Sequence, residues 1–177
     1  MAADNAAPLA MRLPRRFDNA LMTPPDERSA VDAALLATLR DWCEGGMVPM
    51  EPLRVASIAP QPGLDGAACV LDGSHDLARM GRWRGLWWRL QILGRECFGG
   101  RNGQPEAPWD CGWWRAGSLG PASAFHARRA TLLMLREPDF AVAAALISTL
   151  RASSPARVQP LRVLVVSTVA MTGVERL

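Results

Sequence analysis

The apolar positions of the C-terminal third predict a strand, a helix and a second strand. Ala130 to Leu135 is a short apolar run, and Leu161 to Met171 is the stretch richest in β-forming residues. Between them, apolar residues of the segment Pro138 to Ala152 recur every four positions, which is typical of one helical face. If the two strands are adjacent and parallel, the helix crosses one face of the sheet with a right-handed connection.

A first helix is predicted from Thr23 to Glu44. Thr23 supplies a capping hydroxyl, and the two prolines and two acidic residues that follow it suit the first turn of a helix. Apolar residues spaced by four, four and three form a single stripe that we expect to face the core. The stripe consists of Val31, Leu35, Leu39 and Trp42.

A β-hairpin is predicted next. Its strands are Leu53 to Ala59 and Ala67 to Leu71, and the segment Pro62 to Gly66 between them has the composition of a turn. The Trp-rich segment from Trp109 to Gly117 fits either a short strand or an ordered loop.

A second helix is predicted from Ser74 to about Cys97. Gly81 and Gly85 lie one turn apart in it, and such glycines indicate close backbone packing, because each costs about 1 kcal/mol relative to Ala. The apolar residues keep helical spacing, and we favour a core position for them and a solvated rim for the neighbouring arginines. These apolar residues are Leu77, Met80, Trp83, Trp87, Leu90 and Leu93.

These elements predict an α+β or α/β fold with about three helices packed on a four- to five-stranded mixed sheet. The chain has 177 residues, of which 49% are hydrophobic. This is enough to form one hydrophobic core. We expect a single globular domain over residues 24–177, preceded by a flexible N-terminal arm over residues 1–23 that is rich in Ala, Pro and Arg.

Charge is unevenly distributed along the chain. All 20 basic residues are Arg. Residues 26–72 contain three Arg and eight acidic residues, a net charge of −5, whereas residues 73–136 contain ten Arg and four acidic residues, a net charge of +6. The basic part suits an anionic partner such as nucleic acid, but we favour neutralisation within the fold or between subunits.

The sequence favours no enzymatic chemistry, and we expect no metal and no cofactor. The four Cys and two His lack the close spacing of a zinc site. The only nucleophilic triad that can be assembled joins Cys97 or Cys111 to His126 and Asp110, and we favour buried free thiols instead. A chain without Lys cannot carry a P-loop.

No uncharged apolar stretch of about 18 residues is present, so we expect no transmembrane helix. The N-terminal residues lack the pattern of a secretory signal, and we therefore expect a cytoplasmic protein.

Tryptophan and arginine are concentrated in two segments, and both residue types often anchor interfaces. We therefore predict an interaction protein, a subunit, adaptor or accessory factor that contacts a protein partner or a second copy of itself. The predicted partner-binding residues are Arg82, Trp83, Arg84, Trp87, Trp88, Arg89, Trp113, Trp114 and Arg115.

The alternative is a nucleic-acid-binding accessory protein, in which arginines contact phosphates and a tryptophan stacks on a base. The residues predicted for that function are Arg79, Arg82, Arg84, Arg89, Arg128 and Arg129.

Overall fold

The computed structural model of the chain describes the N-terminal arm only from Leu21 onward and leaves several later segments undescribed. The described residues are 21–45, 51–72, 81–97, 109–115, 125, 127, 129–136, 138, 140–153, 159–169 and 173–177.

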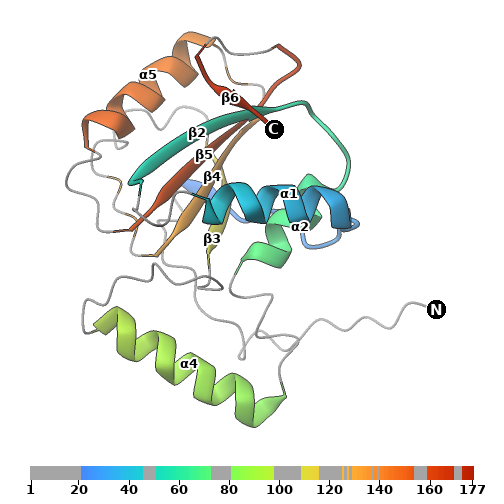
Figure 1. Cartoon of the computed structure of the whole chain (residues 1–177), viewed down its shortest axis with the longest axis vertical. Helices are drawn as coiled ribbons and strands as arrows, with labels where there is room; N and C mark the ends of the chain where they lie inside the picture. The colour runs from blue at the N-terminus through green and yellow to red at the C-terminus, as the bar shows by residue number, and fades with distance from the viewer. Residues whose placement is uncertain are drawn as a thin grey trace.

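Six strands of the described residues form one mixed sheet (Figure 1). Their order across the sheet is β1-β3-β4-β5-β2-β6. β1 runs antiparallel to β3, and all other neighbouring strands are parallel. The strands are β1 (Met22–Thr23), β2 (Leu53–Ile58), β3 (Asp110–Trp114), β4 (Thr131–Arg136), β5 (Leu161–Val166) and β6 (Glu175–Arg176).

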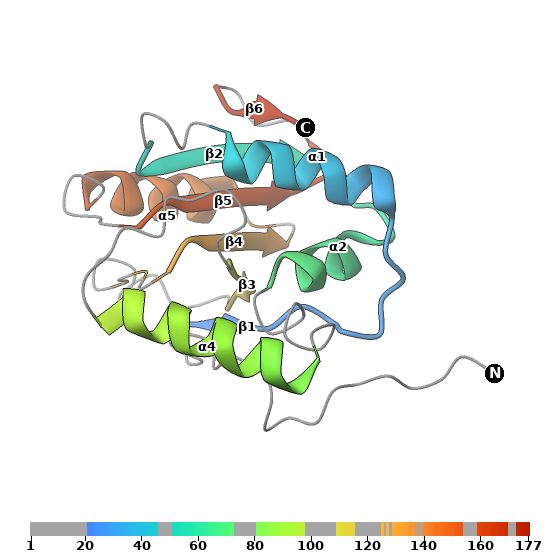
Figure 2. The same cartoon turned by 60° about the horizontal axis from the view of Figure 1, so that its bottom comes forward.

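Helices cover both faces of this sheet. α1 (Ala33–Glu44) and α2 (Leu64–Leu71) pack on one face, and α5 (Phe140–Ala152) packs on the other (Figures 1 and 2). α4 (Arg82–Cys97) covers neither face. The predicted α+β or α/β class is confirmed, with one helix and one strand more than expected in the described part of the chain.

Successive side chains of the central strands point to opposite faces of the sheet, and this alternation divides the core into two halves. In β4, Leu132 and Met134 pack against α1 and α2, whereas Leu133 and Leu135 pack against α5. β5 alternates in the same way and is buried along its whole length. A parallel strand covered on both faces favours near-continuous apolar residues, which explains the runs Leu132 to Leu135 in β4 and Val163 to Val166 in β5.

The predicted strand, helix and strand of the C-terminal third are confirmed. β4 and β5 are adjacent and parallel, with Thr131 opposite Leu161 and Arg136 opposite Val166. The Trp-rich segment after Trp109, for which a strand and a loop were both open, forms β3.

The helix predicted to begin at Thr23 begins instead at Ala33. Asp32 caps it, since its Oδ1 accepts the backbone N–H groups of Ala34 at 2.9 Å and Leu35 at 3.2 Å. The predicted start is wrong because Thr23 belongs to β1, where pairing with β3 holds it in extended backbone. Met22 and Thr23, assigned to the flexible arm, are thus part of the sheet. The buried members of the predicted stripe are Leu35, Leu39 and Trp42.

The first strand of the predicted hairpin is confirmed, and the second strand is wrong. The first strand is β2, but Ala67 to Leu71 belongs to α2 rather than to a second strand. Gly63 adopts a left-handed backbone with φ of 89° immediately before this helix, and a Cβ on Gly66 would collide with the carbonyl oxygen of Ala30. A short apolar run fits a strand and a buried helix equally well, so its pattern alone did not distinguish them.

The second predicted helix is confirmed only in its C-terminal part. α4 begins at Arg82, so Gly81 lies before the helix, and a Cβ built on Gly81 meets nothing within 4 Å. The close packing expected at Gly81 is therefore wrong. The predicted beginning of the helix at Ser74 lies outside the described residues.

Arg162, the second residue of β5, joins the sheet to the end of α1. Its fully buried guanidinium donates to the carbonyl oxygens of Cys43 at 3.0 Å, Gly45 at 3.1 Å and Glu51 at 2.9 Å. The last carbonyl groups of a helix have no partner within the helix, and Arg162 satisfies two such groups here. Loss of hydration lowers the pKa of Arg162 to about 10, so the guanidinium remains charged at neutral pH.

We predict that Arg162→Met lowers the free energy of unfolding by about 3 kcal/mol, because buried carbonyl groups lose their donors. Urea denaturation measures this change. Arg40→Met is the matched control, since Arg40 is exposed on α1 and its replacement should change the free energy by no more than about 0.5 kcal/mol. Equal effects of the two substitutions would contradict the assigned role of Arg162.

Candidate functional site

One face of α4 carries four apolar side chains in contact with solvent. Their exposed fractions are 84% for Trp83, 49% for Leu86, 66% for Trp87 and 53% for Leu90. The four positions have the spacing i, i+3, i+4 and i+7, so they form one continuous stripe along the helix. We call these four residues the α4 stripe.

The position of the α4 stripe corrects the expectation that this helix packs its tryptophans into the core. Trp83, Trp87 and Leu90 are exposed, and Leu93 is partly buried. Neither core cluster of the described residues contains a residue of α4, and Figure 1 shows α4 apart from the helices that cover the sheet. Leu77 and Met80 lie outside the described residues.

The opposite side of α4 is less exposed than the α4 stripe. Gly85 is buried, and Trp88 and Arg89, three and four positions further on, are partly buried. Residues at these spacings share a helical face. The exposed α4 stripe and this less exposed side are therefore opposite faces of one helix.

Basic residues accompany the α4 stripe. The helix contains four Arg and one Glu, and Arg84 is exposed beside Trp83. The side chains of Arg82 and Arg95 are outside the described part of the structure. Tryptophan and arginine thus occur together on an exposed helix.

The other predicted tryptophan pair is built into the sheet. Trp113 and Trp114 are both partly buried in β3, and Trp113 packs against the α1/α2 half of the core while Trp114 packs against the α5 half. Trp114 also meets the edge of the Phe125 ring, with ring centroids 6.1 Å apart. Arg115 is exposed, and its backbone N–H donates to Leu21. Trp113 and Trp114 therefore lie on opposite faces of the sheet.

Arg129 does not fit the predicted nucleic-acid site. Its side chain is buried, and Nη1 lies 3.0 Å from Oδ1 of Asp110, which is also buried. A buried, paired guanidinium does not reach a phosphate. Arg79 and Arg128 lie outside the described residues, which leaves Arg84 as the exposed arginine of that set whose side chain is described.

Cys111 is unsuited to the nucleophilic triad. It is fully buried in β3, and burial, with nearby Asp72 as a smaller cause, raises the pKa of its thiol well above the usual value. Asp110, the proposed third member, is paired with Arg129 instead. His126 and the side chain of Cys97 are not described. Within the described residues, no group of three or more His, Cys, Asp or Glu is placed to hold a metal ion.

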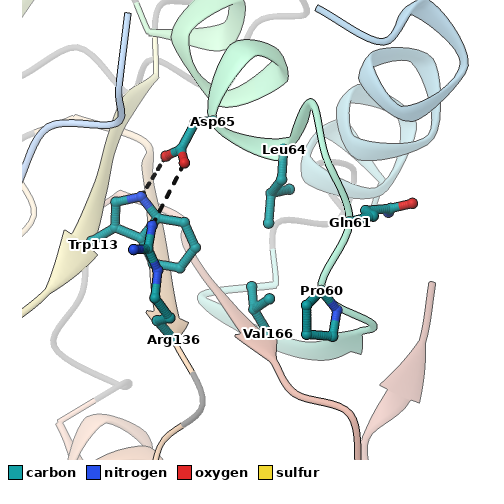
Figure 3. Close-up of a pocket in the computed structure, with 7 residues that line it drawn as sticks. All are labelled: Pro60, Gln61, Leu64, Asp65, Trp113, Arg136 and Val166. Carbon is teal, nitrogen blue, oxygen red and sulfur yellow. Dashed lines mark hydrogen bonds and ion pairs between the residues drawn. The ribbon is translucent and has the colours of Figure 1, made fainter. Parts of the chain in front are cut away.

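The structure also contains a pocket that sequence reasoning missed. It has a volume of about 270 Å³ and lies where β2, β3, β4 and β5 end, at the carboxyl edge of the sheet (Figure 3). Ligands of open parallel sheets bind at this edge. We call it the carboxyl-edge pocket. Its lining residues are Pro60, Gln61, Leu64, Asp65, Trp113, Arg136 and Val166.

Three of these side chains form a linked group, shown in Figure 3. The Trp113 indole N–H donates to Oδ1 of Asp65, and the Arg136 guanidinium stacks on the Trp113 ring, 4.3 Å from its centroid. Nη2 of Arg136 lies 3.6 Å from Oδ2 of Asp65. A second cavity, of about 350 Å³, shares these three residues and extends toward Thr23 and Asp26.

The residues of this pocket are far apart in the sequence. Asp65 belongs to α2, and Trp113 and Arg136 lie near the ends of β3 and β4. The sequence does place a polar or aromatic residue at the end of each of these apolar strands. This pattern predicts a shared pocket only when the strands are known to be parallel neighbours.

Comparisons with known proteins found no family model, no curated protein and no solved structure that matches the chain. In the described part of the chain, none of the helices combines the length and the hydropathy that crossing a membrane requires.

We predict that Trp113→Phe lowers the free energy of unfolding by about 1–2 kcal/mol, because the Asp65 carboxylate loses a donor in a partly buried site. Chemical denaturation monitored by circular dichroism measures the loss. Trp83→Phe makes the same chemical change on the exposed α4 stripe and should leave stability within about 0.5 kcal/mol. Indistinguishable stabilities of the two variants would contradict the role assigned to the Trp113 indole.

Proposed function

We propose that this chain is a non-enzymatic interaction protein of the cytoplasm, acting as a subunit, adaptor or accessory factor that contacts a protein partner through α4. The observation that supports the proposal most directly is the simultaneous exposure of all four residues of the α4 stripe. An amphipathic helix that enters a groove of a partner uses the same i, i+3, i+4, i+7 spacing.

Trp83 and Trp87 supply most of the expected binding energy. A tryptophan buries about 150–250 Å² when it is enclosed, and truncation of a tryptophan at the centre of an interface costs about 2 kcal/mol or more. Monomeric proteins rarely leave a large contiguous apolar patch in water. The stripe is therefore better explained as a surface that a partner covers.

The charge of α4 indicates which kind of groove receives it. Four Arg and one Glu give the helix a strongly basic sequence, so two copies of α4 would bring like charges together. We therefore propose a partner that offers an apolar groove with an acidic rim. Opposite charges at such a rim speed association and orient the helix.

Nucleic-acid binding is the second candidate, favoured by the exposed Arg84 beside Trp83. Bases stack on tryptophan while arginines neutralise phosphates. The protein partner is preferred because Leu86 and Leu90 extend the exposed surface with aliphatic side chains, which complement an apolar groove but provide no stacking plane for a base.

A photo-cross-linking amino acid at position 90 tests the proposal in the cells that produce the protein. We expect a discrete protein adduct at position 90 and none when the same amino acid replaces Ala37, which is exposed on α1. Mass spectrometry identifies the captured protein. With that protein purified, Trp87→Ala should weaken binding by roughly 30-fold, the equivalent of a 2 kcal/mol anchor.

Capture alone does not support the proposal; the affinity loss in Trp87→Ala does. Unchanged affinity in that variant would contradict it. Binding to RNA or single-stranded DNA that weakens steeply with salt, and is abolished by Arg82→Glu with Arg84→Glu, would favour the nucleic-acid candidate instead.

A further inference from the structure

We propose that the carboxyl-edge pocket binds a small organic acid, whose carboxylate is held by Arg136 and whose apolar body contacts Leu64 and Val166. This second binding function is independent of α4. The orientation of Arg136, the unused donors of its guanidinium and the lining of the pocket support it.

Arg136 is held in place from two sides. Its guanidinium carbon lies 4.3 Å from the centroid of the Trp113 ring, and this stacking orients the plane of the guanidinium, whose paired N–H groups form a fork. The Asp65 carboxylate lies 3.6 Å from Nη2 and attracts the guanidinium toward the pocket, while the Arg136 side chain is 67% exposed to solvent. A guanidinium whose plane is fixed loses little conformational entropy when it binds a carboxylate.

Most donors of Arg136 remain available. A guanidinium carries five N–H groups, and a planar carboxylate takes two of them in a bidentate pair. In the part of the chain that the structure describes, the guanidinium of Arg136 makes no hydrogen bond, and its 3.6 Å contact with Asp65 exceeds hydrogen-bond length. The side chain projects from the end of β4 beside the cavity (Figure 3).

Asp65 does not exclude an anion from this site. Its Oδ1 accepts the Trp113 indole N–H and also the backbone N–H of Asp26 at 3.4 Å. These donors offset part of the carboxylate's charge on the side away from the guanidinium. Asp65 thus acts as a positioning residue for Trp113 and Arg136 and leaves the fork for a ligand.

The rest of the lining favours an organic acid over a bare oxyanion. Pro60, Leu64 and Val166 supply apolar surface within the same cavity of about 270 Å³, and the adjoining cavity of about 350 Å³ gives room for a longer body. A few polar groups within an apolar lining are typical of small-molecule sites. Inorganic phosphate uses the guanidinium but gains nothing from the apolar residues.

Benzoate is a suitable probe, and the indole N–H resonance of Trp113 in an NMR spectrum of the full chain reports its binding. Loss of one resonance in Trp113→Phe identifies that signal. We expect benzoate to shift it saturably and Arg136→Gln to raise the dissociation constant by roughly tenfold or more, as for loss of a charged hydrogen bond. Arg136→Lys keeps the charge but loses the fork, so binding should also weaken.

Arg40→Gln is the control, because it removes one exposed guanidinium from α1, outside the pocket lining, and should leave the dissociation constant unchanged. Thermal unfolding of Arg136→Gln verifies that the fold is retained. The proposal is overturned by the absence of a saturable shift, by equal benzoate binding in Arg136→Gln, or by tighter binding of inorganic phosphate than of benzoate. A comparable effect of uncharged benzyl alcohol also overturns it.

Discussion

Coverage of the parallel sheet on both faces is the constraint on which the rest of the structure depends. β4 and β5 are buried on both sides, by α1 and α2 on one face and by α5 on the other. No face of their buried region remains for a further helix. α4 therefore presents its apolar stripe to solvent, although its sequence alone resembles that of a core helix.

The amino and carboxyl ends of the parallel strands form two edges of the sheet that differ in the chemistry of their charged residues. At the amino edge, Arg162 and the pair formed by Arg129 and Asp110 are buried; Arg162 donates to carbonyl oxygens, and Arg129 donates to the Asp110 carboxylate. Buried charges of this kind are costly unless paired, so this edge is structural. At the carboxyl edge, Arg136 remains exposed over Trp113 beside a cavity, with donors to spare. The division matches the general preference of parallel sheets for ligands at their carboxyl ends.

Local patterns were sufficient for some elements and insufficient for others. The strand, helix and strand that became β4, α5 and β5 were predictable because their apolar runs and helical spacing are unambiguous over short distances. Ala67 to Leu71 was mistaken for a strand because five buried apolar residues fit either structure. The start of α1 was misplaced because Thr23 is held by pairing with Trp113, 90 residues away in the sequence.

The candidate sites depend even more on contacts between distant segments, which local sequence patterns do not reveal. Helical spacing identified Trp83 and Trp87 as neighbours on one face, but spacing does not reveal whether another element covers that face. Asp65, Trp113 and Arg136 meet only because β3 and β4 are parallel neighbours and α2 packs over them, and no local pattern encodes that order.

The central claim is that the α4 stripe is open to water in the isolated chain. Hydroxyl-radical footprinting with mass spectrometry measures it residue by residue, since each tryptophan oxidises at a rate set by its exposure. Trp83 and Trp87 should oxidise much faster than Trp42 and Trp109, which are buried in the half of the core that α1 and α2 form with the sheet. Protection of Trp83 and Trp87 equal to that of Trp109 would contradict the account.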